Sequence, residues 1–168
     1  MLCDTPQPYD SGYGAIALTL TSTILKVMMI KTKKIIDMGK FIVHEFDPVL
    51  YPRKIWVVKG TGMDMQQKIK DAFRTPDDDS LSMEGVDKVK AGVWNVMETA
   101  ERKGYGILVW LRTQVDPGAV AHESVHGANY ICRDCGIHFD ALNDEHYAYL
   151  VGFIADCIWQ TWTGKFQK

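Results

Sequence analysis

Two histidines and a glutamate lie within one helical turn of each other in the segment His122-Glu123-Ser124-Val125-His126. In an α-helix, residues four positions apart share a face, so both imidazoles would point the same way. Two imidazoles arranged in this manner can share one zinc ion at about 2.0–2.1 Å. Glu123 stands beside the first of them, where a carboxylate reaches a metal-bound water without binding the metal itself. We therefore expect Zn²⁺ to be held by His122 and His126, with Glu123 as the catalytic general base.

This segment resembles the HExxH motif of the zincin metallopeptidases, and of the gluzincin branch in particular. In that family a second helix downstream provides a glutamate as the third metal ligand. The resemblance implies that Glu145, separated from His126 by 18 residues, is this ligand and that water takes the fourth position. Asp144 is the nearest alternative carboxylate, and Asp140 is a more distant one.

The resemblance covers about residues 105–160 and also carries implications for the substrate. In the family, the strand just before the active-site helix pairs with an extended peptide, and residues 107–111 occupy that place here. The implied activity is peptide-bond hydrolysis by a zinc-activated water, with a peptide or protein as substrate. Four side chains are candidates for stabilising the oxyanion, and the sequence does not select among them: Tyr130, His146, Tyr147 and Tyr149.

Two other functions remain open for the same segment. The chain is similar in style to short phage or prophage proteins that carry HExxH, which suggests a non-catalytic zinc-binding component of a phage particle. A zinc amidohydrolase acting on cell-wall peptides would use the same helix. Bound metal without hydrolysis would indicate the first alternative, and only a choice among substrates separates the second from a protease.

The elements that must position these residues follow from the hydrophobic pattern. Apolar periodicity and turn residues predict strands at 41–46 and 54–59, a helix at 63–73, a hairpin of 92–99 with 106–112, and helices at 117–133 and 144–162. Residues 82–103 also fit a helix, so the first strand of the hairpin competes with that interpretation. Asp116 and Pro117 suit the start of the helix that carries His122, and Asn143 suits the cap of the helix that carries Glu145. The predicted class is α+β: a small antiparallel or mixed sheet packed on the active-site helix and a C-terminal glutamate helix, as in a minimal zincin-like domain.

The predicted domain covers residues 37–168, and residues 1–36 read as an N-terminal extension, for which the sequence leaves open whether it is folded or disordered. Residues 14–30 are mostly apolar or small, but Lys26 interrupts them, and they are shorter than the roughly 20 residues that a membrane span needs. The first 13 residues contain no Lys or Arg, unlike a signal peptide. We therefore expect a cytoplasmic protein without stable membrane association, and keep export or membrane insertion as a minor alternative.

Net charge and cysteine content limit which classes of partner and which type of scaffold we expect. The net charge is −2 and no long basic run occurs, so nucleic acid is not expected as a partner. The four cysteines are too few for a secreted disulfide scaffold. Cys132 and Cys135 form a CxxC at a helix C-terminus, where the helix dipole disfavours a thiolate. We interpret this pair as incidental; a structural zinc would have to recruit His138 and Cys157.

Overall fold

A computed structural model describes residues 32–37, 41–77, 79–99, 104–112 and 114–166. Its centre is one six-stranded sheet with the strand order β1-β2-β3-β6-β5-β4. The strands are β1 (Thr32–Asp37), β2 (Ile42–Phe46), β3 (Lys54–Lys59), β4 (Phe73–Arg74), β5 (Ala91–Glu98) and β6 (Tyr105–Leu111). The helices are α2 (Met63–Ala72), α3 (Pro117–Asp134) and α4 (Glu145–Thr163), with a short 3-10 turn at Val86–Lys88.

The sheet is mixed, one of the two arrangements that the sequence allowed. β3 and β6 pair in parallel at its centre, while β1–β2, β2–β3, β5–β6 and β4–β5 are antiparallel. The parallel pair arises because α2 and the 3-10 turn lie between β3 and β5 and carry the chain across the sheet. The hairpin of β5 and β6 confirms the strand interpretation of residues 92–99.

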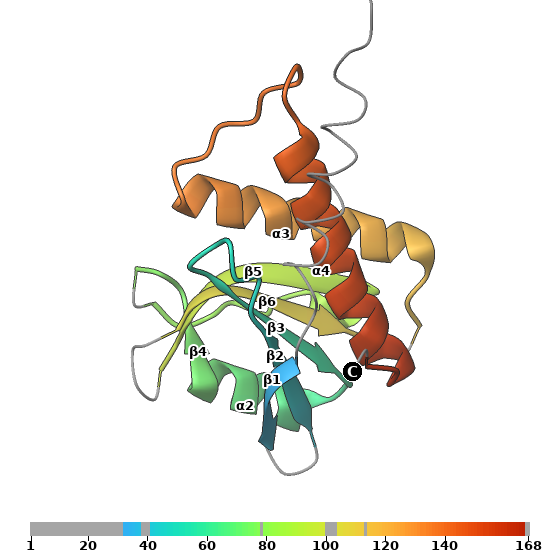
Figure 1. Cartoon of the computed structure of the whole chain (residues 1–168). Helices are drawn as coiled ribbons and strands as arrows, with labels where there is room; N and C mark the ends of the chain where they lie inside the picture. Colours follow the sequence, from blue (N-terminus) through green and yellow to red (C-terminus); the bar gives the residue numbers. More distant parts are fainter. Residues whose placement is uncertain (1–31, 38–40, 78, 100–103, 113, 167–168) are drawn as a thin grey trace, which may run out of the picture.

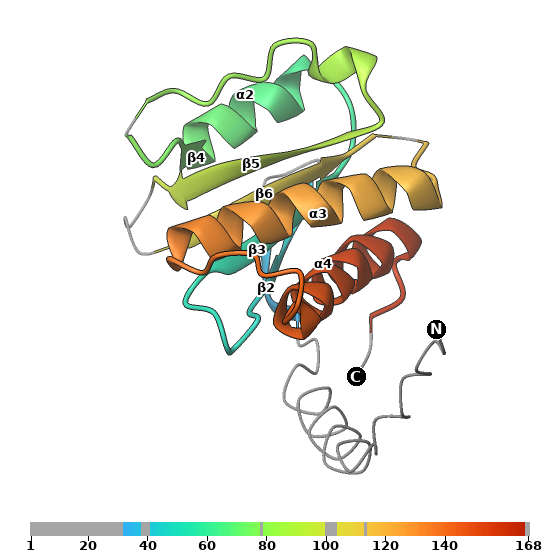
Figure 2. The same cartoon turned by 90° about the horizontal axis from the view of Figure 1, so that it is seen from above.

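The sheet is the middle of three layers (Figures 1 and 2). Alternate residues of each central strand serve opposite faces, as a pleated strand requires. On β3, Ile55 and Val57 pack toward α3 and α4, while Trp56 and Val58 pack toward α2. Because both faces are covered, β3 and β6 are apolar almost throughout, which explains why both strands could be recognised from the sequence.

All three helices fall within one or two residues of their predicted bounds, and α3 and α4 lie side by side on the same face of the sheet (Figure 2). Two local predictions need correction. Residues 32–37 belong to the sheet as β1, paired with β2, although they fall mostly in the range assigned to the extension; residues 1–31 lie outside the described part of the chain. The N-cap of α4 is Asp144 rather than Asn143, and no side-chain hydrogen bond caps this helix. No helix among the described residues is both long enough and apolar enough to cross a membrane.

Candidate metal centre

The helix α3 begins at a well-defined cap. The carboxylate of Asp116 accepts a hydrogen bond from the backbone N–H of Ala119 at 2.8 Å, and Pro117 fills the first helical position. Lys90, which lies just before β5, forms an ion pair with the same carboxylate. Both contacts lower the pKa of Asp116, and the Lys90 hydrogen bond contributes most. The first turn of α3 is therefore fixed in place immediately before the histidines.

His122 and His126 lie together on the exposed side of α3. Their Nε2 atoms are 3.1 Å apart, and the ring centroids are 4.6 Å apart with the planes at 77°. Zinc placed 2.0–2.1 Å from two nitrogens at this separation would form an angle of about 100° between them, somewhat below the tetrahedral value. The two predicted histidine ligands are thus brought together with a spacing that fits one metal ion.

Glu123 differs from its two neighbours because it is turned inward. Its residue is only 8% exposed, on the side of α3 that faces β5. Burial raises the pKa of this carboxyl, and the nearby charges of His122 and His126 partly oppose the increase. Together with His122 it lines a shallow cavity of about 420 Å³ that also includes Lys90, Ala91 and Asp116. Sequence reasoning missed the part played by Lys90 and Ala91, because both come from a strand region remote from the motif.

Glu145 is placed differently from the histidine pair. It is exposed at the first position of α4, about 200° around the helix from Tyr147, whose hydroxyl contacts α3. The single proton of that hydroxyl has two acceptors within reach, Asn129 Oδ1 at 2.9 Å and the Val125 carbonyl at 3.3 Å, so this end of α4 lies beside the middle of α3. In the described residues no group of three or more His, Cys, Asp or Glu side chains could hold a metal ion. The third metal ligand therefore stays a prediction: Glu145, or in its place Asp144 or Asp140.

The side chains predicted as oxyanion stabilisers differ in the contacts that they already make. The Tyr147 hydroxyl is already used as a donor to α3. The Tyr130 ring has the Arg133 guanidinium 5.0 Å from its centroid. His146 Nε2 is buried without a hydrogen-bond partner in the described structure, and its backbone carbonyl accepts from the Tyr51 hydroxyl at 3.4 Å. No described contact links any of these groups to His122 or His126.

The strand expected to pair with substrate is not available for pairing. β6 has β3 on one side and β5 on the other, so its backbone groups are already committed. The expectation for residues 107–111 is therefore wrong, since sequence order does not reveal which strand stands at an edge. β5 has the open edge instead: its outer neighbour β4 covers only Met97 and Glu98 among the described residues.

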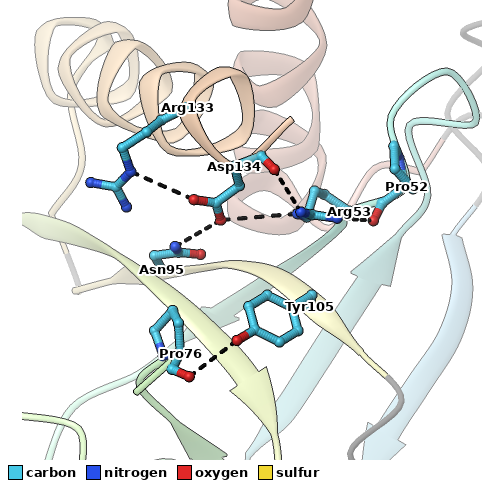
Figure 3. A network of polar contacts seen from close by, with 7 residues as sticks. All are labelled: Pro52, Arg53, Pro76, Asn95, Tyr105, Arg133 and Asp134. Carbon is cyan, nitrogen blue, oxygen red and sulfur yellow. Dashed lines mark hydrogen bonds and ion pairs between the residues drawn. The ribbon is translucent and has the colours of Figure 1, made fainter. Parts of the chain in front are cut away.

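The C-terminal half of α3 is held by a network of polar contacts (Figure 3). Asn95 on β5 donates to the Asp134 carboxylate at 2.7 Å. Arg53, just before β3, donates to the Asp134 carbonyl at 2.8 Å and places its Nε 3.9 Å from the carboxylate. Arg133 reaches the same carboxylate through Nε at 3.5 Å. This network ties α3 to two strands, and nothing in the spacing of these residues along the chain predicted it.

The cysteines show no sign of a second metal site in the described residues. Cys132 and Cys157 are buried, Cys135 is half-buried, and all three are free thiols. Burial raises the pKa of Cys132, and raises that of Cys157 much further. The interpretation of this CxxC as incidental stays a prediction.

Comparisons with family models, curated protein sequences and solved structures found no match for this chain.

Proposed function

We propose that this protein is a zinc-dependent hydrolase that cleaves peptide bonds. The observation that carries the proposal is the 3.1 Å approach of His122 Nε2 and His126 Nε2 beside the buried carboxylate of Glu123. An exposed helix has no structural need for two converging imidazoles next to an inward-turned glutamate, whereas a metal-activated water needs all three. The cavity that His122 and Glu123 share gives a substrate access to them.

When bound, zinc supplies a polarised water and a Lewis acid for the scissile carbonyl. The imidazoles of His122 and His126 hold the ion. Glu123 accepts a proton from the water as the water attacks the carbonyl carbon and the new C–O bond forms. Glu123 then delivers that proton to the amide nitrogen, and the C–N bond breaks as the amine leaves. A carboxyl whose pKa is raised by burial is better suited to both transfers than an exposed one.

The edge of β5 offers a place for the substrate backbone. The Glu98 N–H donates to the Gly104 carbonyl, and the Arg112 N–H donates to the Lys90 carbonyl. Even-numbered residues of β5 therefore direct their backbone N–H and C=O groups toward β6. Ala91, Val93 and Asn95 therefore direct theirs outward, because these groups alternate along an antiparallel strand. An extended peptide can add to this edge by strand pairing, and Ala91 already lines the cavity that contains Glu123.

The substitution Val93→Pro tests this placement. Proline at this position removes only an outward N–H, which an edge strand tolerates. We expect KM for a peptide substrate to rise about tenfold, the effect of about 1.4 kcal/mol of lost binding, while kcat changes little. The matched control is Trp94→Pro, which removes an N–H directed at β6 and should lower the melting temperature instead. An unchanged KM in a folded Val93→Pro protein would place the substrate elsewhere.

Glu145 remains the proposed third protein ligand. For its carboxylate to reach the metal, the first turn of α4 has to rotate or shift relative to α3. Without this movement, waters would fill the positions that His122 and His126 leave open. A variant Glu145→Gln that binds zinc as tightly as the parent protein would remove it from this role.

A second candidate is a non-catalytic zinc-binding protein, such as a structural component of a phage particle. This candidate predicts bound zinc without hydrolysis, or a site closed by a fourth protein ligand. The zinc amidohydrolase alternative uses the same three side chains, so the discriminating observation is which substrate is cleaved.

The deciding experiment measures zinc content and cleavage of casein and of cell-wall peptides in the parent protein and in Glu123→Gln. We expect one zinc per chain in both, and a decrease in kcat of about 10²–10⁴-fold in the variant. Glu45→Gln is the matched control, because Glu45 is also buried but already accepts from Lys54 at 2.8 Å and from Trp56 at 3.2 Å. Zinc binding with no hydrolysis of any substrate would favour the second candidate, and full activity in Glu123→Gln would exclude Glu123 as the base.

A further inference from the structure

A second cavity lies farther along α3, past the histidine pair. It has a volume of about 210 Å³ and lies between the C-terminal half of α3, the loop that follows, and Tyr147 of α4. The side chains that line it include Asn129, Arg133, Ile137, His138, Phe139 and Tyr147. Phe139 and Tyr147 form an edge-to-face wall, with ring centroids 5.2 Å apart. The cavity combines an apolar wall with a polar rim, the usual composition of a small-ligand site.

Three side chains of this lining can donate hydrogen bonds to a ligand, Asn129, Arg133 and His138, and the buried thiol of Cys132 lines it as well. Asn129 Oδ1 already accepts from the Tyr147 hydroxyl, which orients the amide and leaves its NH₂ group to donate to a ligand. Arg133 lines the cavity, with its guanidinium 5.0 Å from the Tyr130 ring and its Nε 3.5 Å from the Asp134 carboxylate, so its two terminal nitrogens are left to donate to a ligand (Figure 3). The His138 ring adds an N–H in either tautomer. Such a set of donors matches an oxygen anion, and above all a carboxylate, which arginine binds in a planar fork. The dipole of α3, whose C-terminus borders the cavity, opposes an anion there, so the positive charge of Arg133 has to outweigh it.

The cavity is in line with the proposed metal site. Counting 100° per residue, His122, His126, Asn129 and Arg133 lie within about 60° of one another on the exposed side of α3. Along the axis, Asn129 is about 4.5 Å and Arg133 about 10 Å beyond His126, at 1.5 Å per residue. An extended peptide advances about 3.3 Å per residue, so these donors stand one to three residues from a bond cleaved at the histidines.

We propose that this cavity binds a carboxylate of the peptide substrate, either an acidic side chain or the C-terminal carboxylate, close to the scissile bond. Assigning the carboxylate to a substrate rests on the proposed function, but carboxylate binding by the cavity does not. The residues that give the selectivity are Arg133 and Asn129, with Phe139 and Tyr147 as the wall.

The nearby acidic residues do not occupy the cavity. Asp134 is turned toward Arg53 and Asn95 on the sheet side of α3. Asp140, whose Oδ1 accepts from the Leu142 N–H at 2.9 Å, lies outside the lining, as do Asp144 and Glu145. These exposed charges oppose an anion only through solvent, where salt screens them, whereas Arg133 and Asn129 contact the ligand directly.

The test is a binding experiment on the full chain carrying Glu123→Gln, so that nothing is cleaved. Three peptides are titrated calorimetrically with and without zinc: acetyl-trialanine with a free C-terminus, its C-terminal amide, and the amide with a central glutamate. We expect at least one of the two carboxylate peptides to bind about tenfold more tightly than the neutral amide, in zinc-free protein as well. Preference for the first identifies a terminal carboxylate as the ligand, and preference for the third identifies an acidic side chain.

Adding Arg133→Gln should abolish this preference while leaving the affinity for the neutral amide unchanged. Lys70→Gln, which removes one positive charge from α2 on the opposite face of the sheet, should preserve it. Equal affinities for all three peptides, or a preference that survives Arg133→Gln, would overturn the proposal. If this preference is present but the parent protein, with Glu123 intact and zinc bound, cleaves no peptide, the carboxylate site stands and the proposed function alone fails.

Discussion

Both halves of α3 carry polar side chains, but the two halves differ in the contacts that these side chains make. In the C-terminal half, Asp134 has contacts from Arg53, Asn95 and Arg133, so its charge is already matched (Figure 3). In the N-terminal half, His122 and His126 converge on each other, beside the buried carboxyl of Glu123.

At Asp134 this difference marks a residue that holds the fold, and at His122 and His126 it marks residues suited to a ligand. A polar group with partners from two strands and its own helix fixes the helix in position. Two imidazole nitrogens 3.1 Å apart on an exposed helix face gain little from each other, because a hydrogen bond between neutral rings contributes only about 1 kcal/mol. A metal ion shared by both gains far more, so the N-terminal half of the helix has the character of a binding site.

The largest effect that would sharpen this comparison is expected from the histidines. His122→Ala and His126→Ala should each weaken zinc binding by more than about 100-fold, since even loss of a residue behind a metal ligand costs 10–100-fold. Competition with a chromophoric chelator measures the affinity. His138→Ala is the control and should leave the affinity unchanged. Zinc binding that tolerates either helix substitution would end the distinction between the two halves.

The next effect concerns the network at the other end of α3. Asp134→Ala removes the acceptor of the Asn95 amide and the carboxylate near Arg53 Nε, although Arg53 still bonds the backbone carbonyl of residue 134, and it should lower the free energy of unfolding by about 1–3 kcal/mol. Urea denaturation measures the loss. Asp77→Ala, at an exposed carboxylate on the loop after β4, should stay within about 0.5 kcal/mol of the parent protein. If Asp134→Ala also reduced zinc affinity as strongly as His122→Ala, the network would belong to the metal site.

The smallest effect comes from a glycine between the two halves. A Cβ at Gly127 would lie 2.7 Å from Ile107 Cδ1 and 3.3 Å from Ile154 Cδ1, so alanine there requires the ends of these two side chains, on β6 and α4, to shift. Overpacking by one methyl costs about 1–3 kcal/mol, and the gain of about 1 kcal/mol in helix propensity offsets part of this. We expect a net loss of about 1 kcal/mol in urea denaturation.

Gly152→Ala on α4 is the matched control for this substitution. No described atom outside its own helix turn lies within 4 Å of the position that the new methyl group would take, so only the helix propensity changes and a gain of up to about 1 kcal/mol is expected. Equal stabilisation by both substitutions would mean that α3 is not pressed against the sheet at Gly127.

Much of the fold was predictable because it depends on local signals. The apolar runs of β3 and β6 and the Asp116-Pro117 start of α3 are readable in the chain itself, and the structure has each within one or two residues of its expected place. The Asn143 cap failed because Asp144 stands next to it and either side chain satisfies the same local pattern. β1 was missed because its pairing with β2, rather than its own composition, makes it a strand.

Part of the site was predictable for the same reason. His122, Glu123 and His126 lie within one turn, so helix geometry alone fixes their relative positions. Glu145 is on another helix, and its distance from the histidines depends on how α4 crosses α3, which no spacing in the chain encodes.

By itself, the sequence determined that α3 is a helix and that its two histidines share one face, because a hydrogen-bonded helix has a single period. Only the tertiary structure decided that Glu123 is buried against β5, that β5 rather than β6 has the open edge, and that Arg53 and Asn95 converge on Asp134. Those outcomes depend on contacts between residues far apart in the chain, and such contacts are selected by packing the whole sheet between its helices.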